Sequence, residues 1–169
     1  MEPPVILIGI GSNLAASPFG SPLETATAAL GQLPGAGVEI VRRSRWYLSE
    51  PVPPSDQPWF VNAVVAAATS LAPEPLLDRL LELESRFGRV RGELNAARTV
   101  DLDLLDYDAR RCANARLVLP HPRLPKRRFV LAPLCEIASQ WRHPLLDLTA
   151  TELLAGLPVG QPIRVFGED

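Results

Sequence analysis

The chain has 169 residues, of which 47% are hydrophobic and 21% are charged, and its formal net charge is −2. This length and composition are typical of one globular domain with a substantial core, so we expect a single domain over residues 1–169. The small net charge provides no general attraction to nucleic acid or to an anionic membrane, and binding to either is not expected.

Two features of the sequence bear on the cellular location: the cysteines and the N-terminal segment. Cys112 and Cys135 are far apart and have no metal-ligand spacing, so we interpret both as free thiols in a reducing compartment. The start "MEPPVILIGIG" has no basic region, and its apolar run is too short to span a bilayer. These features predict a cytoplasmic protein.

In the first half of the chain, strand patterns flank one helix. The stretch "PVILIGIG" predicts a buried strand that ends in a tight turn at its glycines. Ser21, Pro22 and Glu24 form a capping-box start, which predicts a helix from Pro22 to about Leu33. The stretches "VEIVRRSRWYLSEP" and "WFVNAVVAAATSL" each predict a strand, and the Pro-rich "VPPSDQP" between them predicts the loop of a hairpin-like pair.

The second half continues with a helix, a strand and further short elements. The leucines of "APEPLLDRLLELESRFGR" have helical spacing, and Gly88 is expected to end that helix. The stretch "RVRGELNAAR" predicts a loop, and "TVDLDLLDYD" predicts a strand. A short strand with a Pro-rich loop follows in "ARLVLPHPRLPKR", and "RRFVLAPLCEIA" and "TATELLAGL" predict two helices, the first with Pro133 near its start or at a kink.

This order of elements indicates the fold class. A β-α-β-β-α-β series with a further strand and helices is the pattern of an α+β, ferredoxin-like (split βαβ) sandwich. We therefore expect a mainly antiparallel sheet with its helices on one face. No internal repeat or domain linker interrupts the series.

Two carboxylates interrupt the apolar run "RTVDLDLL". Since alternate residues of a strand share a face, Asp101 and Asp103 are expected to point the same way, with Cα atoms about 6.6 Å apart. Val100, Leu102 and Leu104 would fill the core on the other face. Paired carboxylate oxygens suit Mg²⁺, which takes its remaining ligands from water and phosphates, and two ions could share such a pair.

The surroundings of this pair favour a phosphate site over the alternative, a polar strand face with arginine partners. Arg86, Arg89, Arg91 and Arg98 precede it, and guanidinium groups bind phosphate oxygens in a bidentate way. The common Gly-rich phosphate-binding motifs are absent from the sequence. A phosphoryl-transfer enzyme built this way would use metal and arginine on another scaffold.

With these residues identified, the chain resembles the 6-hydroxymethyl-7,8-dihydropterin pyrophosphokinase (HPPK) family of folate biosynthesis. Six motifs follow in family order: "GIGSNL", "SRWYLSEPV", "DQPWFVNAVV", "LLELESRFGRVR", "ARTVDLDLL" and "LVLPHPRLPKRRFVLAPL". The resemblance implies a single HPPK-like domain with an αβα sandwich fold. It implies transfer of pyrophosphate from MgATP to the hydroxymethyl group of the pterin, with release of AMP. The implied cofactors are two Mg²⁺ ions, with ATP as co-substrate, and we expect a monomer.

The resemblance also assigns residues by motif. Asp101 and Asp103 resemble the metal ligands, and Arg89 and Arg98 resemble the catalytic loop arginines. Residues similar to the ATP contacts are Glu84, Arg91, Arg98, Leu104, Arg116, His121 and Arg127. Residues similar to the pterin contacts are Gly11, Ser49, Glu50, Val52, Phe60, Asn62, Asp101 and Phe129. In this scheme Phe60 and Phe129 sandwich the ring, and Asn62 and the backbone of residues 49–52 bind its polar edge.

The chain departs from the family pattern before the acidic pair. "LNAA" at residues 94–97 replaces the expected Arg-Trp-Gly-Pro, which removes a cation and an aromatic ring from a loop that closes over the substrates. Phe60 replaces a common Tyr and keeps the stacking face. Two alternatives stay open: an RNA-binding module, disfavoured by the net charge, and a weakened homologue acting as a partner protein, disfavoured by the intact Arg98 and acidic pair.

Overall fold

A six-stranded sheet forms the middle layer of the computed structural model, which describes residues 5–13, 20–51, 53–87 and 99–167. Its strands are β1 (Ile6–Ser12), β2 (Val38–Arg43), β3 (Tyr47–Ser49), β4 (Phe60–Thr69), β5 (Asp101–Tyr107) and β8 (Ile163–Val165). They follow the order β5-β1-β4-β3-β8, with β2 also paired to β4, and these pairings are all antiparallel. The prediction of a mixed fold with a mainly antiparallel sheet is confirmed.

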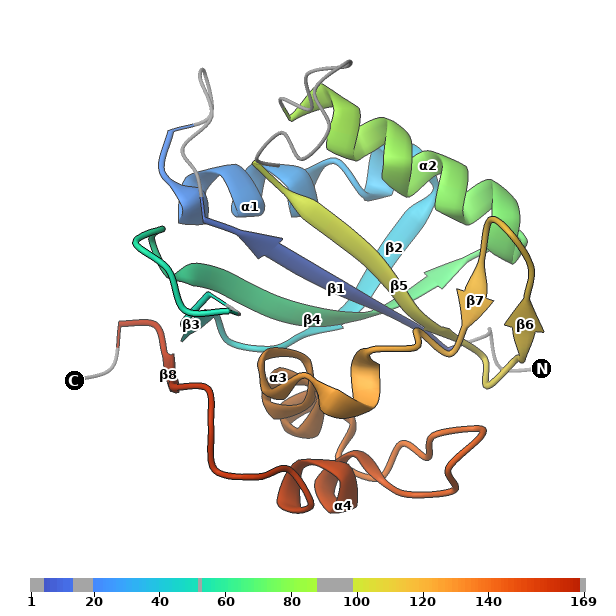
Figure 1. Ribbon diagram of the computed structural model, residues 1–169. Coiled ribbons are helices and arrows are strands. Elements are labelled where there is room, and N and C mark those ends of the chain that lie inside the picture. The colour runs from blue at the N-terminus through green and yellow to red at the C-terminus, as the bar shows by residue number, and fades with distance from the viewer. Residues whose placement is uncertain (1–4, 14–19, 52, 88–98, 168–169) are drawn as a thin grey trace.

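Helices cover both faces of this sheet (Figure 1). On one face lie α1 (Pro22–Gly31) and α2 (Pro73–Arg86), and on the other lie α3 (Arg128–Ala138) and α4 (Ala150–Ala155). The expectation of helices on a single face, drawn from the order of elements, was wrong, because α3 and α4 follow the βαββαβ series and pack against the side that it leaves open. The αβα sandwich implied by the family resemblance agrees with these two helical layers. In the described part of the chain, no helix combines the length and the apolar character needed to cross a membrane.

Each helical layer has its own hydrophobic cluster. Under α1 and α2, β1 contributes Ile6, Ile8 and Ile10, and the cluster extends to Leu80 and Phe87. The second cluster, under α3 and α4, contains Leu7, Val64, Leu105, Val130, Leu131, Leu134, Ile137, Ala150 and Leu153 as its main buried residues. Alternate residues of one strand therefore serve two cores, which explains why β1 is apolar throughout.

The predicted helix starts agree with the structure. Ser21 precedes α1 and its hydroxyl accepts a hydrogen bond from the Glu24 backbone N–H. Thr149 and Glu152 form a reciprocal capping box at the start of α4. Pro133 lies inside α3, five residues after its first residue. The prediction that Gly88 ends α2 lies outside the described residues, although Phe87 is the C-cap of that helix.

The strand predicted over residues 38–51 is broken in two. Between β2 and β3, the backbone N–H of Ser44 donates to the Val64 carbonyl, and the Ser44 hydroxyl accepts from the Val64 N–H at 3.0 Å. The side chain thus replaces a backbone carbonyl in the ladder, and the chain turns there. A bulge between Ile40 and Arg42 already disturbs the register of β2.

Four further short elements among the described residues lie outside this sheet and its helices. β6 (Cys112–Ala113) and β7 (Val118–Leu119) pair with each other, and the 3₁₀ turns η1 (Pro34–Ala36) and η2 (Leu124–Lys126) precede β2 and α3. β8 pairs with β3 and was not predicted from the sequence. The strand β1 also extends to Ser12, so the tight turn expected at Gly9 and Gly11 is wrong, and both glycines are part of the sheet.

Candidate active site

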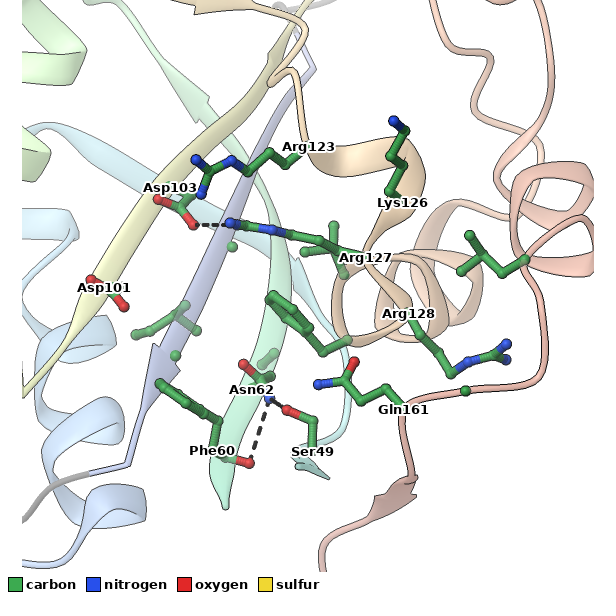
Figure 2. A pocket seen from close by; sticks show the side chains of 18 of the residues that line it. Ser49, Phe60, Asn62, Asp101, Asp103, Arg123, Lys126, Arg127, Arg128 and Gln161 are labelled. Atoms are coloured by element: carbon green, nitrogen blue, oxygen red, sulfur yellow. Dashed lines mark hydrogen bonds and ion pairs between the residues drawn. The ribbon is translucent and has the colours of Figure 1, made fainter. Parts of the chain in front are cut away.

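A cavity of about 680 Å³ lies on the face of the sheet that carries α3. Its floor comes from β1, β4 and β5, one wall comes from residues 122–130, and the other comes from residues 157–161. Figure 2 shows acidic side chains at one end and an aromatic and amide group at the other. The cavity therefore offers two chemically different halves in one concave space.

The register of the sheet aligns the floor residues. Asp101 pairs with Gly11, and Gly11 pairs with Asn62, so these three residues form one row across β5, β1 and β4. Asp103 pairs with Gly9 in the neighbouring row. Since cross-strand partners point to the same face, the two carboxylates and the Asn62 amide face the same cavity. The expectation that Asp101 and Asp103 share a face is confirmed.

Glycine in the middle of the floor keeps it open. A Cβ atom placed on Gly11 would stand 3.0 Å from the Asn62 Oδ1 and would press on that amide. Without side chains at positions 9 and 11, a ligand can lie directly over β1, between the carboxylates on β5 and the amide on β4. This need for space explains the glycines better than a turn does.

Basic residues face the acidic pair across the cavity. Arg127 Nη1 lies 3.8 Å from Asp103 Oδ2, and the Arg127 guanidinium carbon is 5.3 Å from the centroid of the Phe129 ring. Arg123, Lys126 and Arg128 line the same wall (Figure 2). Partial burial lowers the pKa of Arg127, while the charge of Asp103 opposes that shift. The wall thus presents more positive charge than Asp103 alone neutralises.

His121 lies beside this charge cluster. Burial lowers its pKa, the charge of Asp103 opposes this shift, and the charges of Arg127 and Arg123 add to it. Its backbone N–H donates to the Leu105 carbonyl at 2.8 Å, which ties the loop after β7 to β5. A neutral imidazole is therefore favoured at neutral pH, and it can donate or accept one hydrogen bond per nitrogen.

The opposite half of the cavity combines aromatic and amide groups. Phe60 and Phe129 both line it, although they are far apart in the sequence. Asn62 is buried, with 4% of its surface exposed, and its Nδ2 donates to the Ser49 hydroxyl at 2.6 Å. Ser49 pairs with Phe60 in the sheet. These four predicted residues are thus brought together in the structure.

Other predicted residues do not line the cavity. Glu84 is buried on α2, and its Oε1 accepts a hydrogen bond from the Leu102 N–H at 2.7 Å. The Leu104 side chain belongs to the core under α1 and α2. Arg116 is exposed and forms an ion pair with Asp78. Glu50 and His121 do not line the cavity either, although each is adjacent in the sequence to a lining residue, Ser49 or Pro122.

Several other predictions fall outside the described residues. They are Val52, Arg89, Arg91, Arg98 and the departure over residues 94–97.

Sequence reasoning missed part of the lining. The basic wall residues Arg123, Lys126 and Arg128 belong to the run "RLPKRR", whose clustered positive charge was an available signal. Leu157, Pro158, Gly160 and Gln161 also line the cavity. No motif marks this second group, because its position depends on the pairing of β8 with β3.

The acidic pair offers a small set of oxygen donors for a metal ion. Among the described residues, no group of three or more His, Cys, Asp or Glu side chains could hold a metal ion. Asp101 and Asp103 supply carboxylate oxygens that are only partly buried and face the cavity. Such a pair fits Mg²⁺, which binds through one or two carboxylates and completes its shell with water and substrate phosphates.

Comparisons with known proteins agree on one family. Residues 7–139 match the model of the 7,8-dihydro-6-hydroxymethylpterin-pyrophosphokinase (HPPK) family. The 2-amino-4-hydroxy-6-hydroxymethyldihydropteridine pyrophosphokinase of Synechocystis is 41% identical over 148 residues, which cover 88% of this chain and 73% of that protein. The protein of the same name from Pseudomonas aeruginosa is 40% identical over 156 residues, with 90% and 91% covered.

Solved structures support the same fold. The wild-type HPPK-DHPS crystal structure of Plasmodium falciparum superimposes with a TM-score of 0.69 at 12% sequence identity. The match covers 91% of this chain and 41% of that one. At this identity, the likeness concerns the fold alone.

Proposed function

Because this chain belongs to the 7,8-dihydro-6-hydroxymethylpterin-pyrophosphokinase family, we infer that it transfers pyrophosphate from ATP to the hydroxymethyl group of 6-hydroxymethyl-7,8-dihydropterin in folate synthesis. ATP is the co-substrate, and AMP is the second product. The observation that best supports this function is the two-part cavity, in which a carboxylate pair facing cations adjoins an aromatic and amide site.

The charged half suits the triphosphate of ATP. Asp101 and Asp103 are proposed to bind two Mg²⁺ ions, which when bound would neutralise the phosphate oxygens and orient them. Arg127 supplies a guanidinium from the opposite wall, and its ion pair with Asp103 holds that group beside the proposed metal and phosphate site. Transfer of a phosphoryl group needs alignment and charge stabilisation more than covalent chemistry, and these residues provide both.

The aromatic half suits the pterin. Phe60 and Phe129 are proposed to stack on the two faces of the ring, an arrangement favoured for flat heteroaromatic groups. Asn62 is proposed to bind the polar edge, since its amide lies in the same row of the sheet as Asp101. This shared row would bring the hydroxymethyl group near the phosphates that the acidic pair holds.

The remaining assignments stay predictions. They comprise the catalytic role of Arg89 and Arg98, the ATP contacts of Glu84, Arg91, Leu104, Arg116 and His121, and the pterin contacts of Glu50 and Val52. We further propose that the strand order β5-β1-β4 is the centre of a split βαβ, ferredoxin-like arrangement. A single domain, a monomer and a cytoplasmic location also stay predictions.

The direct test is to incubate the protein with ATP, Mg²⁺ and 6-hydroxymethyl-7,8-dihydropterin and to measure AMP by chromatography. Wild-type protein is expected to form AMP only when the pterin is present. Absence of pterin-dependent AMP would reject this function and favour a homologue that has lost activity.

The acidic pair is tested in the same assay. Asp101→Ala and Asp103→Ala are each expected to lower kcat by at least about 100-fold, the order seen when a charge-stabilising group is lost from an active site. Asp147→Asn changes a carboxylate whose side chain is 88% exposed and lies away from the cavity, so it serves as the matched control with unchanged turnover. Wild-type turnover in either alanine variant would contradict the metal assignment.

A further inference from the structure

The C-terminal segment forms a wall of the cavity beside the proposed pterin edge. β8 pairs with β3, so that Ile163 lies opposite Ser49. Just before this pair, the Glu50 N–H donates to the Pro162 carbonyl at 3.2 Å. Residues 157–161 are therefore held beside Ser49 and Glu50, although more than a hundred positions separate them in the sequence.

Among the residues of this segment that line the cavity, Gln161 is the one with a polar side chain. It reaches from the C-terminal segment toward Ser49 and Asn62 (Figure 2). Its Nε2 donates a hydrogen bond to the Glu50 carbonyl. This bond fixes the orientation of the amide, and among the described residues no donor reaches its Oε1.

The two amides of the cavity have the same arrangement. Asn62 directs its Nδ2 to the Ser49 hydroxyl, just as Gln161 directs its Nε2 to the Glu50 carbonyl. Each amide thus uses its N–H group within the protein and keeps a carbonyl oxygen to offer a ligand. A pair of acceptors placed this way selects a ring edge that carries N–H donors.

The substrate named for the related enzymes carries such a donor. A 2-amino-4-hydroxy-pteridine has an exocyclic amino group on its pyrimidine ring. When the ring lies over β1 with its hydroxymethyl group toward Asp101, the pyrimidine ring points away from the acidic pair. Gln161, in the wall of residues 157–161, lies on that side of the cavity, across from Asp101 (Figure 2).

We propose that Gln161 is a specificity-determining residue, whose Oε1 accepts a hydrogen bond from the amino group of the pterin while its Nε2 holds the Glu50 carbonyl. This inference rests on the proposed function, because it takes the substrate from there. An oriented acceptor of this kind favours the amino pterin over an analogue that lacks the group, since the analogue leaves the acceptor without a partner.

The test combines one substitution, Gln161→Leu, with one change in the ligand, the removal of its amino group. Binding of 6-hydroxymethylpterin and of its 2-deamino analogue is measured by fluorescence titration in the presence of Mg²⁺ and a non-hydrolysable ATP analogue. Gln161→Leu is expected to weaken binding of the amino pterin by roughly 3- to 10-fold, the usual contribution of one hydrogen bond, and to leave binding of the deamino analogue within about twofold.

The control and the possible outcomes distinguish a specificity role of Gln161 from a packing role, from no role, and from failure of the proposed function. Gln140→Leu alters an exposed glutamine just after α3 and is expected to bind both ligands like the wild type. Equal weakening of both ligands by Gln161→Leu would show a packing role only, and unchanged binding of both would show no role, so either result overturns the proposal. If the wild type neither binds the pterin nor forms AMP, the proposed function itself fails.

Discussion

At the scale of single residues, period-two spacing predicted that Asp101 and Asp103 share one face of β5, and the register of the sheet confirms it, because side chains alternate along any strand. Phe60 and Asn62 were assigned by the family resemblance, and the structure places both in the lining of the same cavity. The spacing could not show that β1 lies between β5 and β4, nor that Gln161 approaches from the C-terminal segment. Contacts between distant segments depend on strand order, which local spacing does not encode.

Asp106 shows a second limit at this scale. It lies on the same strand as the partly exposed Asp101 and Asp103, yet only 2% of its surface is exposed. Its Oδ2 accepts from the Trp141 indole N–H at 3.1 Å and from the Ala109 N–H at 3.2 Å. Within the described part of the chain, Oδ1 has no hydrogen-bond partner. Burial raises the pKa of this carboxyl, although the two hydrogen bonds oppose the shift.

This raised pKa predicts a pH dependence of stability. Because the folded state holds the proton more tightly than the unfolded state does, folding is favoured most below the unfolded pKa of about 3.9. That contribution is lost as pH rises through the higher folded pKa, and ionised Asp106 then destabilises the protein. We expect Asp106→Asn to raise the free energy of unfolding at pH 7 by about 1 kcal/mol, measured by urea denaturation.

Measurement from pH 4 to 7 gives the diagnostic comparison. The advantage of Asp106→Asn over the wild type should shrink as pH falls, because the wild-type carboxyl becomes protonated. Asp147→Asn alters an exposed carboxylate and is expected to leave the wild-type pH profile unchanged. A constant difference across the range would argue against an ionised Asp106 at neutral pH.

At the scale of elements, helices were predicted better than strands. Caps and 3.6-residue spacing are local signals, and they located α1, α2 and α4 closely. The strand pattern over residues 38–51 concealed a break, because nothing in the alternation shows that Ser44 takes part in the ladder through its side chain. β8 has three residues, too few for a periodic signal.

The break between β2 and β3 can be tested through Ser44. This buried side chain accepts from the Val64 N–H and donates to the Arg45 carbonyl at 2.8 Å. Ser44→Ala leaves the Val64 N–H without a partner, and we expect a loss of about 1–3 kcal/mol in the free energy of unfolding. Ser85→Ala removes an exposed hydroxyl on α2 and should stay within about 0.5 kcal/mol of the wild type in the same denaturation experiment.

At the scale of the whole molecule, the sheet separates two cores and places the cavity on the side of the smaller one. The element order predicted the antiparallel sheet, because short connections favour neighbouring strands. The order of elements alone did not predict the second helical layer, since the βαββαβ series accounts for one layer only, and the αβα sandwich was implied by the family resemblance instead.

Binding of ligand at this cavity should stabilise the whole fold. With MgATP present at about 100 times its Kd, the free energy of unfolding is expected to rise by about 2.7 kcal/mol, which corresponds to about 5–11 °C in Tm for a chain of this size. EDTA added with ATP should remove most of that shift, because the carboxylate pair then repels the triphosphate. A thermal melt measures both, and an equal shift with and without EDTA would contradict a metal-dependent site.

The division into two cores has a consequence for altering the enzyme. The wall formed by residues 122–130 and 157–161 is anchored to the layer of α3 and α4, while the larger cluster lies behind the sheet. A combinatorial library directed at the exposed side chains of that wall would therefore sample new ligand preferences without changing the larger buried cluster behind the sheet. Ligand preference and the stability of the larger cluster could then be altered by different substitutions.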